Sequence, residues 1–203
     1  MPSSLHFNYS NNNRLLNFKA IIWCPESNRF LLGADATVKE LKMQTQIVLG
    51  TDSTLTGSWN IWDHLRLAKE TKQAKDHEIF EMLTSAPAAL WNLNKGSIAT
   101  GKDADIVVAK RKSGNAMNSF FETNPEDILL IIQEGMLKIF DASIISQLDA
   151  AGFQTRDFVP VHVNGTEKWV PHQMLNIIRS ITEINPTVCF PCTVLENKQV
   201  FSL

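Results

Sequence analysis

The stretch Ile47-Val48-Leu49-Gly50-Thr51-Asp52-Ser53 decides the fold, because an apolar triplet stops at a glycine and leads directly into polar residues. An earlier run, Lys19-Ala20-Ile21-Ile22-Trp23, is also nearly all apolar and stops at Cys24-Pro25. Short unbroken apolar runs are typical of strands buried on both faces of a parallel sheet. Helical patterns follow over 36–43 and 59–71, so this part of the chain predicts an α/β fold with parallel strands.

The rest of the chain has a different sequence pattern, in which turn signals separate short apolar runs. Turn signals and short apolar runs over 94–141 predict a small antiparallel β unit. Residues 142–203 combine helical patterns with an Asn164-Gly165 pair between two apolar runs, which is a strong β-hairpin signal. We therefore expect three segments: 18–93 with the parallel strands, 94–141 with the β unit, and 142–203 as a mixed α+β extension.

The composition excludes several classes of protein. The 203 residues are 44% hydrophobic and 20% charged, with a formal net charge of −2, so there is no basic field to hold nucleic acid. No apolar run approaches the ~18 residues of a membrane span, and the first residues have no signal-peptide pattern. Three cysteines argue against a disulfide framework and favour a reducing compartment, so we expect a cytoplasmic protein.

Two motifs at the predicted strand ends carry the candidate chemistry. Asp52 follows the strand that ends at Leu49, where a carboxylate can ligate a divalent metal and accept a proton from water. The plainer alternative is that Asp52 caps a turn or the next helix. Ser27 and Asn28 follow the earlier strand, where they can act as hydrogen-bond donors or, alternatively, form a structural turn.

A third motif, Gly96-Ser97-Ile98-Ala99-Thr100-Gly101-Lys102-Asp103-Ala104-Asp105-Ile106-Val107-Val108, contains turn glycines and a strand but nothing that looks catalytic. Taken in this order, the three motifs resemble the C-terminal portion of the amidohydrolase superfamily, with the cytosine deaminase/chlorohydrolase-like branch as the most similar. The resemblance covers 19–140. It implies the last two strands of a (β/α)8 barrel, followed by a portion of a β-sandwich.

The resemblance also implies a reaction. Such enzymes hydrolyse C–N bonds of amides, cyclic amides or aminated heterocycles with water activated by a divalent metal, zinc or iron. Asp52 would be the metal ligand and proton shuttle. Ser27, Asn28 and Ser53 would contact a small-molecule substrate.

The chain lacks other parts that the family needs. A complete (β/α)8 barrel takes roughly 250 residues, and a catalytic zinc takes about three protein ligands. The five histidines form no His-x-His pair; they are His6, His64, His77, His162 and His172. The Cys189-Phe190-Pro191-Cys192 motif is a single CxxC, which is weak evidence for a zinc or redox site.

Three interpretations follow. The first is a C-terminal fragment of a metal-dependent amidohydrolase that needs a missing N-terminal half for activity. The second is a catalytically incomplete remnant that acts as a binding or oligomerisation module, for example as a homo-oligomer. In a third and weaker possibility, the histidines of this chain assemble a metal site with Asp52.

Overall fold

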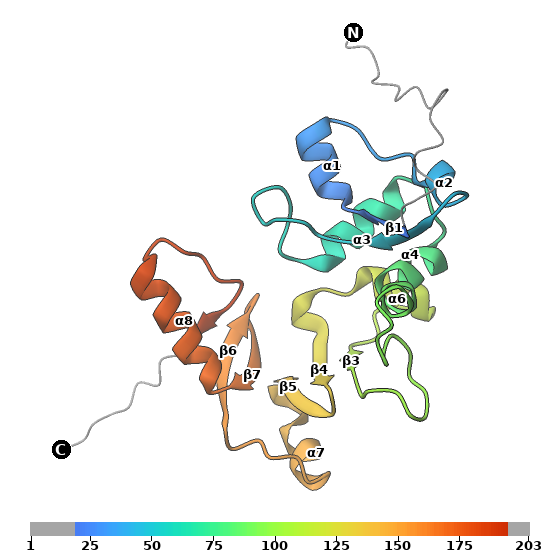
Figure 1. Ribbon diagram of the computed structural model, residues 1–203. Coiled ribbons are helices and arrows are strands. Elements are labelled where there is room, and N and C mark those ends of the chain that lie inside the picture. Colours follow the sequence, from blue (N-terminus) through green and yellow to red (C-terminus); the bar gives the residue numbers. More distant parts are fainter. Residues whose placement is uncertain (1–18, 195–203) are drawn as a thin grey trace, which may run out of the picture.

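The computed structural model describes residues 19–194, which form a mixed α/β protein (Figure 1). Within this range, strands β1 (Ala20–Trp23) and β2 (Gln46–Leu49) pair in parallel, with Ile21 opposite Ile47. Both strands and their parallel pairing confirm the prediction from the apolar runs. His6 lies outside the described residues. No helix in the described part of the chain is long and apolar enough to cross a bilayer.

Helices follow both strands of this pair, and a further helix follows the later strand at residues 106–109. They are α1 (Pro25–Leu32), α2 (Val38–Leu41), α3 (Ile61–Glu70), α4 (Asp76–Leu83), α5 (Ser85–Leu90) and α6 (Ala116–Glu122). The chain after Trp23 is a helix and not the turn that we considered, because Pro25 occupies the first helical position, where a missing N–H costs nothing. Helix α1 ends at Gly33 in a left-handed conformation, with φ of 64°.

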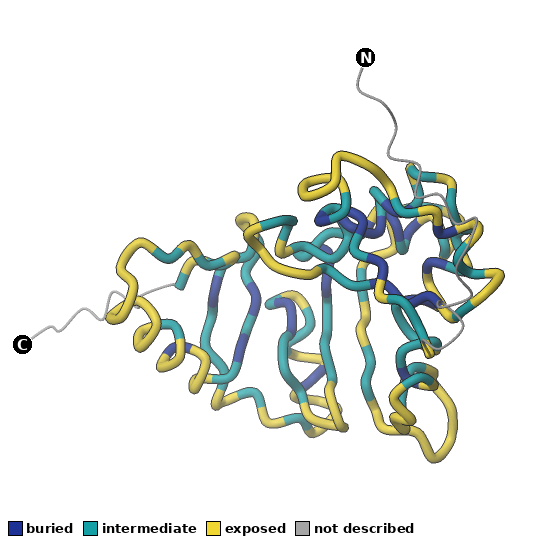
Figure 2. Tube along the Cα trace, turned by 45° about the horizontal axis from the view of Figure 1, so that its top comes forward, coloured by how far each residue is buried: buried dark blue, intermediate teal, exposed yellow. Residues whose placement is uncertain are grey.

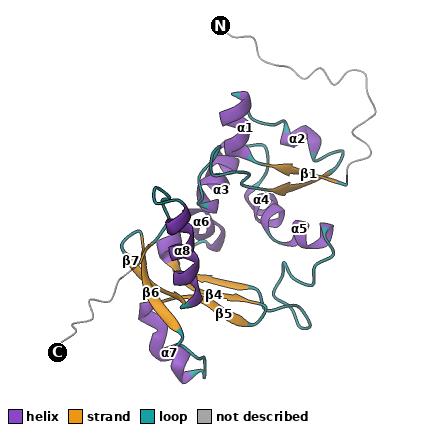
Figure 3. Cartoon of the chain, turned by 60° about the vertical axis from the view of Figure 1, so that its left-hand side comes forward, coloured by secondary structure: helices purple, strands orange, loops and turns teal. Residues whose placement is uncertain are grey.

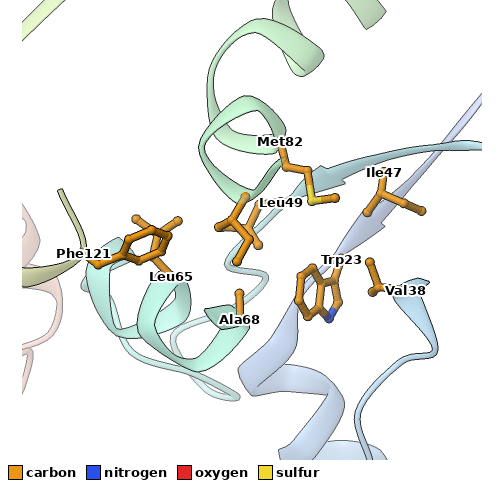
Figure 4. Packing of buried hydrophobic residues seen from close by; sticks show 9 residues of the cluster. Trp23, Val38, Ile47, Leu49, Leu65, Ala68, Met82 and Phe121 are labelled. Carbon is orange, nitrogen blue, oxygen red and sulfur yellow. The ribbon is translucent and has the colours of Figure 1, made fainter. Parts of the chain in front are cut away.

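One face of the β1–β2 pair is covered by α3 and α4, and this contact forms the main core (Figure 4). Side chains at alternate strand positions point into it. The core contains Trp23, Val38, Ile47, Leu49, Leu65, Ala68, Ile79, Met82 and Phe121. Burial of each large apolar side chain contributes about 1.5–3 kcal/mol, so this packing fixes how the two strand ends lie. Figure 2 shows that buried positions gather where strands and helices meet, whereas the loops are mostly exposed.

A second sheet lies apart from β1 and its helices (Figure 3). Its six described strands are antiparallel in the order β3-β4-β5-β7-β6-β8. They are β3 (Ile106–Ala109), β4 (Ile128–Gln133), β5 (Met136–Asp141), β6 (Phe158–Val163), β7 (Thr166–Pro171) and β8 (Thr193–Val194). The remaining helices are η2 (Pro125–Asp127), η3 (Ala142–Ile144), α7 (Ile145–Ala150) and α8 (Gln173–Ile184).

The Asn164-Gly165 hairpin is confirmed. Both residues have positive φ, 47° and 78°, as a two-residue type I′ turn requires. Strands β5 and β7 pair through Phe140 and Trp169, so the sheet runs across the predicted boundary between residues 141 and 142. The three-segment division stays a prediction.

A buried lysine holds this junction together. Lys168 on β7 is almost fully buried, and its ammonium contacts Asp141 Oδ2 at 2.6 Å and the carbonyls of Glu126 and Ile128 at 2.8 and 2.6 Å. All three N–H groups therefore have an acceptor. Burial alone would raise the pKa of Asp141, but hydrogen bonds from Lys168 and Ser143 outweigh it and lower the pKa to about 2.

Candidate functional site

The carboxyl ends of β1 and β2 bring Cys24 and Asp52 together. The Gly50 amide donates to the Trp23 carbonyl at 2.9 Å, which continues the parallel pairing beyond both strands. The Asp52 backbone then forms a hydrogen bond with Cys24. Asp52 has φ of 57°, a left-handed conformation that is uncommon for a residue other than glycine, and its side chain is exposed. The predicted carboxylate therefore lies at the open end of the strand pair.

The carboxylate of Asp52 influences the pKa of the neighbouring Cys24 thiol. Burial, and after it the negative charge of Asp52, raises the pKa of the Cys24 thiol, while the hydrogen bond from the Asp52 backbone acts in the opposite direction. Because the net effect is a raised pKa, Cys24 remains a protonated thiol near neutral pH.

The other predicted polar residues lie on the same side of the strand pair. Ser27 is buried on α1, and its hydroxyl lies 2.7 Å from Thr56 Oγ1. Thr56 in turn donates from its amide to the Ser53 carbonyl at 3.0 Å, so Ser27 and Ser53 share one network. The half-buried Asn28 donates its amide to the Cys24 carbonyl at 2.9 Å in the first turn of α1. Contacts of these residues with a substrate stay predictions.

Two residues that the sequence did not single out lie beneath the loop that carries Asp52. Glu26 on α1 accepts a hydrogen bond from the Ser58 amide. His64 on α3 is 0% exposed and donates from Nε2 to the Ser58 carbonyl at 2.7 Å, and the same nitrogen lies 3.5 Å from Glu26 Oε2. The one signal in the sequence was that Glu26 stands inside the Cys-Pro-Glu-Ser-Asn motif. His77 and His172, each near the start of a helix, are exposed.

The described residues do not fit a complete metal centre. Within residues 19–194, no group of three or more His, Cys, Asp or Glu side chains lies close enough to hold a metal ion. The strand ends offer only the Asp52 carboxylate and the Cys24 thiol, whereas a catalytic zinc takes about three protein ligands. The possibility that the described histidines complete a site with Asp52 therefore finds no support.

Among the solved structures that are similar to this chain, two are deaminases. Aminofutalosine deaminase from Helicobacter pylori, in complex with methylthio-coformycin, is 22% identical with a TM-score of 0.52; the match covers 57% of this chain and 31% of that one. Guanine deaminase from C. acetobutylicum, with bound guanine in its active site, is 19% identical with a TM-score of 0.51, and the match covers 63% and 37%. At these identities the likeness concerns the fold.

This chain thus spans about a third of each deaminase. A search of curated proteins found no match. The family model of the amidohydrolases, in contrast, matches residues 11–137, which is more than half of the chain and includes β1, β2 and the loop with Asp52. The chain belongs to the amidohydrolase family.

Proposed function

We propose that this chain supplies the C-terminal part of a metal-dependent amidohydrolase, with Asp52 at the catalytic centre. The reaction is hydrolysis of a C–N bond other than a peptide bond, in a small amide, cyclic amide or aminated heterocycle. The observation that carries the proposal is the place of Asp52, at the open carboxyl end of the second of two parallel strands in a chain of this family.

The exposed carboxylate of Asp52 suits a proton-transfer role. A carboxylate can accept a proton from an attacking water and return it to a leaving nitrogen. The Asp52 side chain makes no hydrogen bond with other residues in the described part of the chain, so both oxygens are available to water or substrate. The neighbouring Cys24 remains protonated and does not compete as a base.

The metal needs ligands from outside the described residues. Amidohydrolases generally use a divalent metal, which supplies Lewis acidity to the reaction, and Asp52 would contribute one ligand. Because the match covers about a third of each solved deaminase, we propose that the remaining ligands come from a polypeptide that completes the barrel. Ser27, Asn28 and Ser53 remain the proposed substrate-side residues, with Ser27 acting through Thr56.

The test is turnover by the protein purified from its natural cells with any partner attached. A panel of cyclic amides and aminated purines and pyrimidines, followed by ammonia release and ultraviolet absorbance, covers the proposed substrate class. Asp52→Asn should lower turnover by at least about 100-fold. Asp157→Asn, which also changes an exposed aspartate, is the control and should leave turnover unchanged. Wild-type turnover in Asp52→Asn, or no turnover of any panel member, would contradict the proposal.

A second candidate function rests on exposed apolar side chains near β1. Ile22 is 57% exposed, and the consecutive residues Phe30, Leu31 and Leu32 at the end of α1 are also mostly exposed. Exposed apolar groups of this kind, on β1 and α1, favour a binding or oligomerisation surface. In this alternative the chain is a catalytically incomplete module that associates with itself.

Light scattering across micromolar concentrations separates the two functions. The alternative predicts a wild-type oligomer and a monomer for the double variant Phe30→Ser/Leu32→Ser, whose exposed positions leave the core intact. A wild-type chain that remains monomeric at every concentration would contradict it.

A further inference from the structure

Residues 50–60 form the loop between β2 and α3, which we call the β2–α3 loop, and it is held by side chains that follow β1. Ser27 reaches Thr56, hydroxyl to hydroxyl, at 2.7 Å. Glu26, one residue earlier on α1, accepts the amide hydrogen of Ser58. Two adjacent residues of α1 therefore bind the middle and the end of this loop.

Helix α3 also holds the end of this loop, at Ser58. The His64 ring on α3 is fully buried, and its Nε2 lies 2.7 Å from the Ser58 carbonyl. A carbonyl oxygen only accepts, so Nε2 carries the proton, while Nδ1 is buried with no partner among the described residues. Glu26 and His64 thus bind the N–H and the C=O of one residue, Ser58.

The backbone lies so close to this pair that a side chain is excluded. A Cβ on Gly57 would lie 2.7 Å from Glu26 Oε2 and 2.9 Å from His64 Cε1. The hydroxyl of Ser58 is held as well, because it donates to Asp63 Oδ2 at 2.8 Å. The end of the β2–α3 loop is therefore fixed from three directions.

We propose that Glu26 and His64 are positioning residues that fix the β2–α3 loop and thereby present Asp52 at the strand ends. The Asp52 side chain has no hydrogen bond of its own within residues 19–194, and its backbone adopts a left-handed φ of 57°. This conformation is unfavourable for most non-glycine residues, and although aspartate tolerates it better than most, contacts of the surrounding loop help to maintain it. The place of the carboxylate thus depends on the contacts of the loop as well as on the backbone hydrogen bond with Cys24. The catalytic meaning of this positioning rests on the proposed function.

Hydrogen–deuterium exchange of the full chain, resolved by peptide, tests the positioning directly and requires neither metal nor substrate. In Glu26→Ala, the amides of residues 51–60 should exchange about tenfold faster, since the loop loses a charge-assisted hydrogen bond. Glu26→Gln retains a side-chain oxygen and should restore slow exchange. Gly57→Ala should also speed exchange in the loop, because the new Cβ displaces the pair.

Asp105→Ala is the matched control, since Asp105 also accepts a backbone amide hydrogen, from Glu134 at 2.8 Å, but in the other sheet. It should speed exchange near Glu134 and leave residues 51–60 unchanged. Unchanged exchange of the β2–α3 loop in both Glu26→Ala and Gly57→Ala would overturn the proposal. A loop that loosens equally in Asp105→Ala would overturn it too, because the effect would then be global.

Turnover of the natural assembly connects the loop to catalysis. Glu26→Ala should lower kcat at least about tenfold with KM changed less, and Glu26→Gln should recover most of that loss. Wild-type kcat in a Glu26→Ala variant with a loosened loop would overturn the positioning role. Wild-type kcat in Asp52→Asn would instead contradict the proposed function, while the exchange result would stand.

Discussion

The buried pair of Lys168 and Asp141 allows a prediction worked through from the structure. Asp141 is 4% exposed, and its pKa falls from 3.8 to about 2 in the folded chain. At about 1.4 kcal/mol per pH unit, this difference contributes about 2 kcal/mol to the free energy of unfolding. Because the pKa is lowered on folding, this contribution is complete above pH 3.8 and is lost as the pH falls toward 2.

The perturbation is Asp141→Asn. At neutral pH it leaves the buried Lys168 ammonium with carbonyl partners but no counter-charge, which should lower the free energy of unfolding by about 3–5 kcal/mol. As the pH falls, the wild type loses the contribution of Asp141 and the variant does not. Relative to neutral pH, the difference between their free energies of unfolding should therefore be smaller by about 1 kcal/mol at pH 3 and by about 2 kcal/mol at pH 2.

The assay is urea unfolding followed by circular dichroism between pH 2 and pH 7. Other carboxyl groups with lowered pKa values, such as Asp105, contribute equally to both proteins and cancel in the difference. In Asp157→Asn, which changes an exposed residue, the free energy of unfolding should vary with pH as it does in the wild type. A gap between wild type and Asp141→Asn that stays constant with pH would refute the reasoning.

Three further predictions concern the strand pair and its surroundings. Asp52→Asn should lower the pKa of Cys24, because it removes a nearby negative charge. Iodoacetamide should then alkylate Cys24 faster at pH 8, as measured by peptide mass spectrometry. An unchanged rate would contradict the placement of Asp52. Gly96→Ala should lower the free energy of unfolding by about 2 kcal/mol, because φ is +85° and the new Cβ would lie 2.6 Å from the Ala88 Cβ. Leu65→Ala should cost about 2–5 kcal/mol in urea unfolding, since Leu65 is 0% exposed in the main core; a cost below 1 kcal/mol would contradict that packing.

Local patterns predicted the elements of this fold well. The unbroken apolar runs that end at Trp23 and Leu49 became parallel strands, because such runs have no polar face to offer water. The Asn164-Gly165 pair formed its hairpin, because both residues accept positive φ. The helix that begins at Pro25 was not foreseen, although a proline in the first turn was a signal for it.

Contacts between residues far apart in the sequence could not be predicted from local patterns. The pairing of Phe140 with Trp169 extends the second sheet across residue 141, and no local pattern specifies it. Glu26 Oε2 and His64 Nε2 lie 3.5 Å apart in the fold, but most of α1, all of α2, β2 and the β2–α3 loop separate the two residues in the sequence. The place of Asp52 at the strand end was predicted, whereas the loop contacts that fix it required the structure.

Metal content tests the central claim most directly, the claim being that Asp52 belongs to the metal-dependent centre of an amidohydrolase. The protein is purified from its natural cells, and zinc and iron are measured by mass spectrometry in the wild type, Asp52→Asn and the control Asp157→Asn. The account predicts stoichiometric metal in the wild type and the control, and a loss of metal in Asp52→Asn. Equal metal in all three proteins, or none in the wild type, would contradict it.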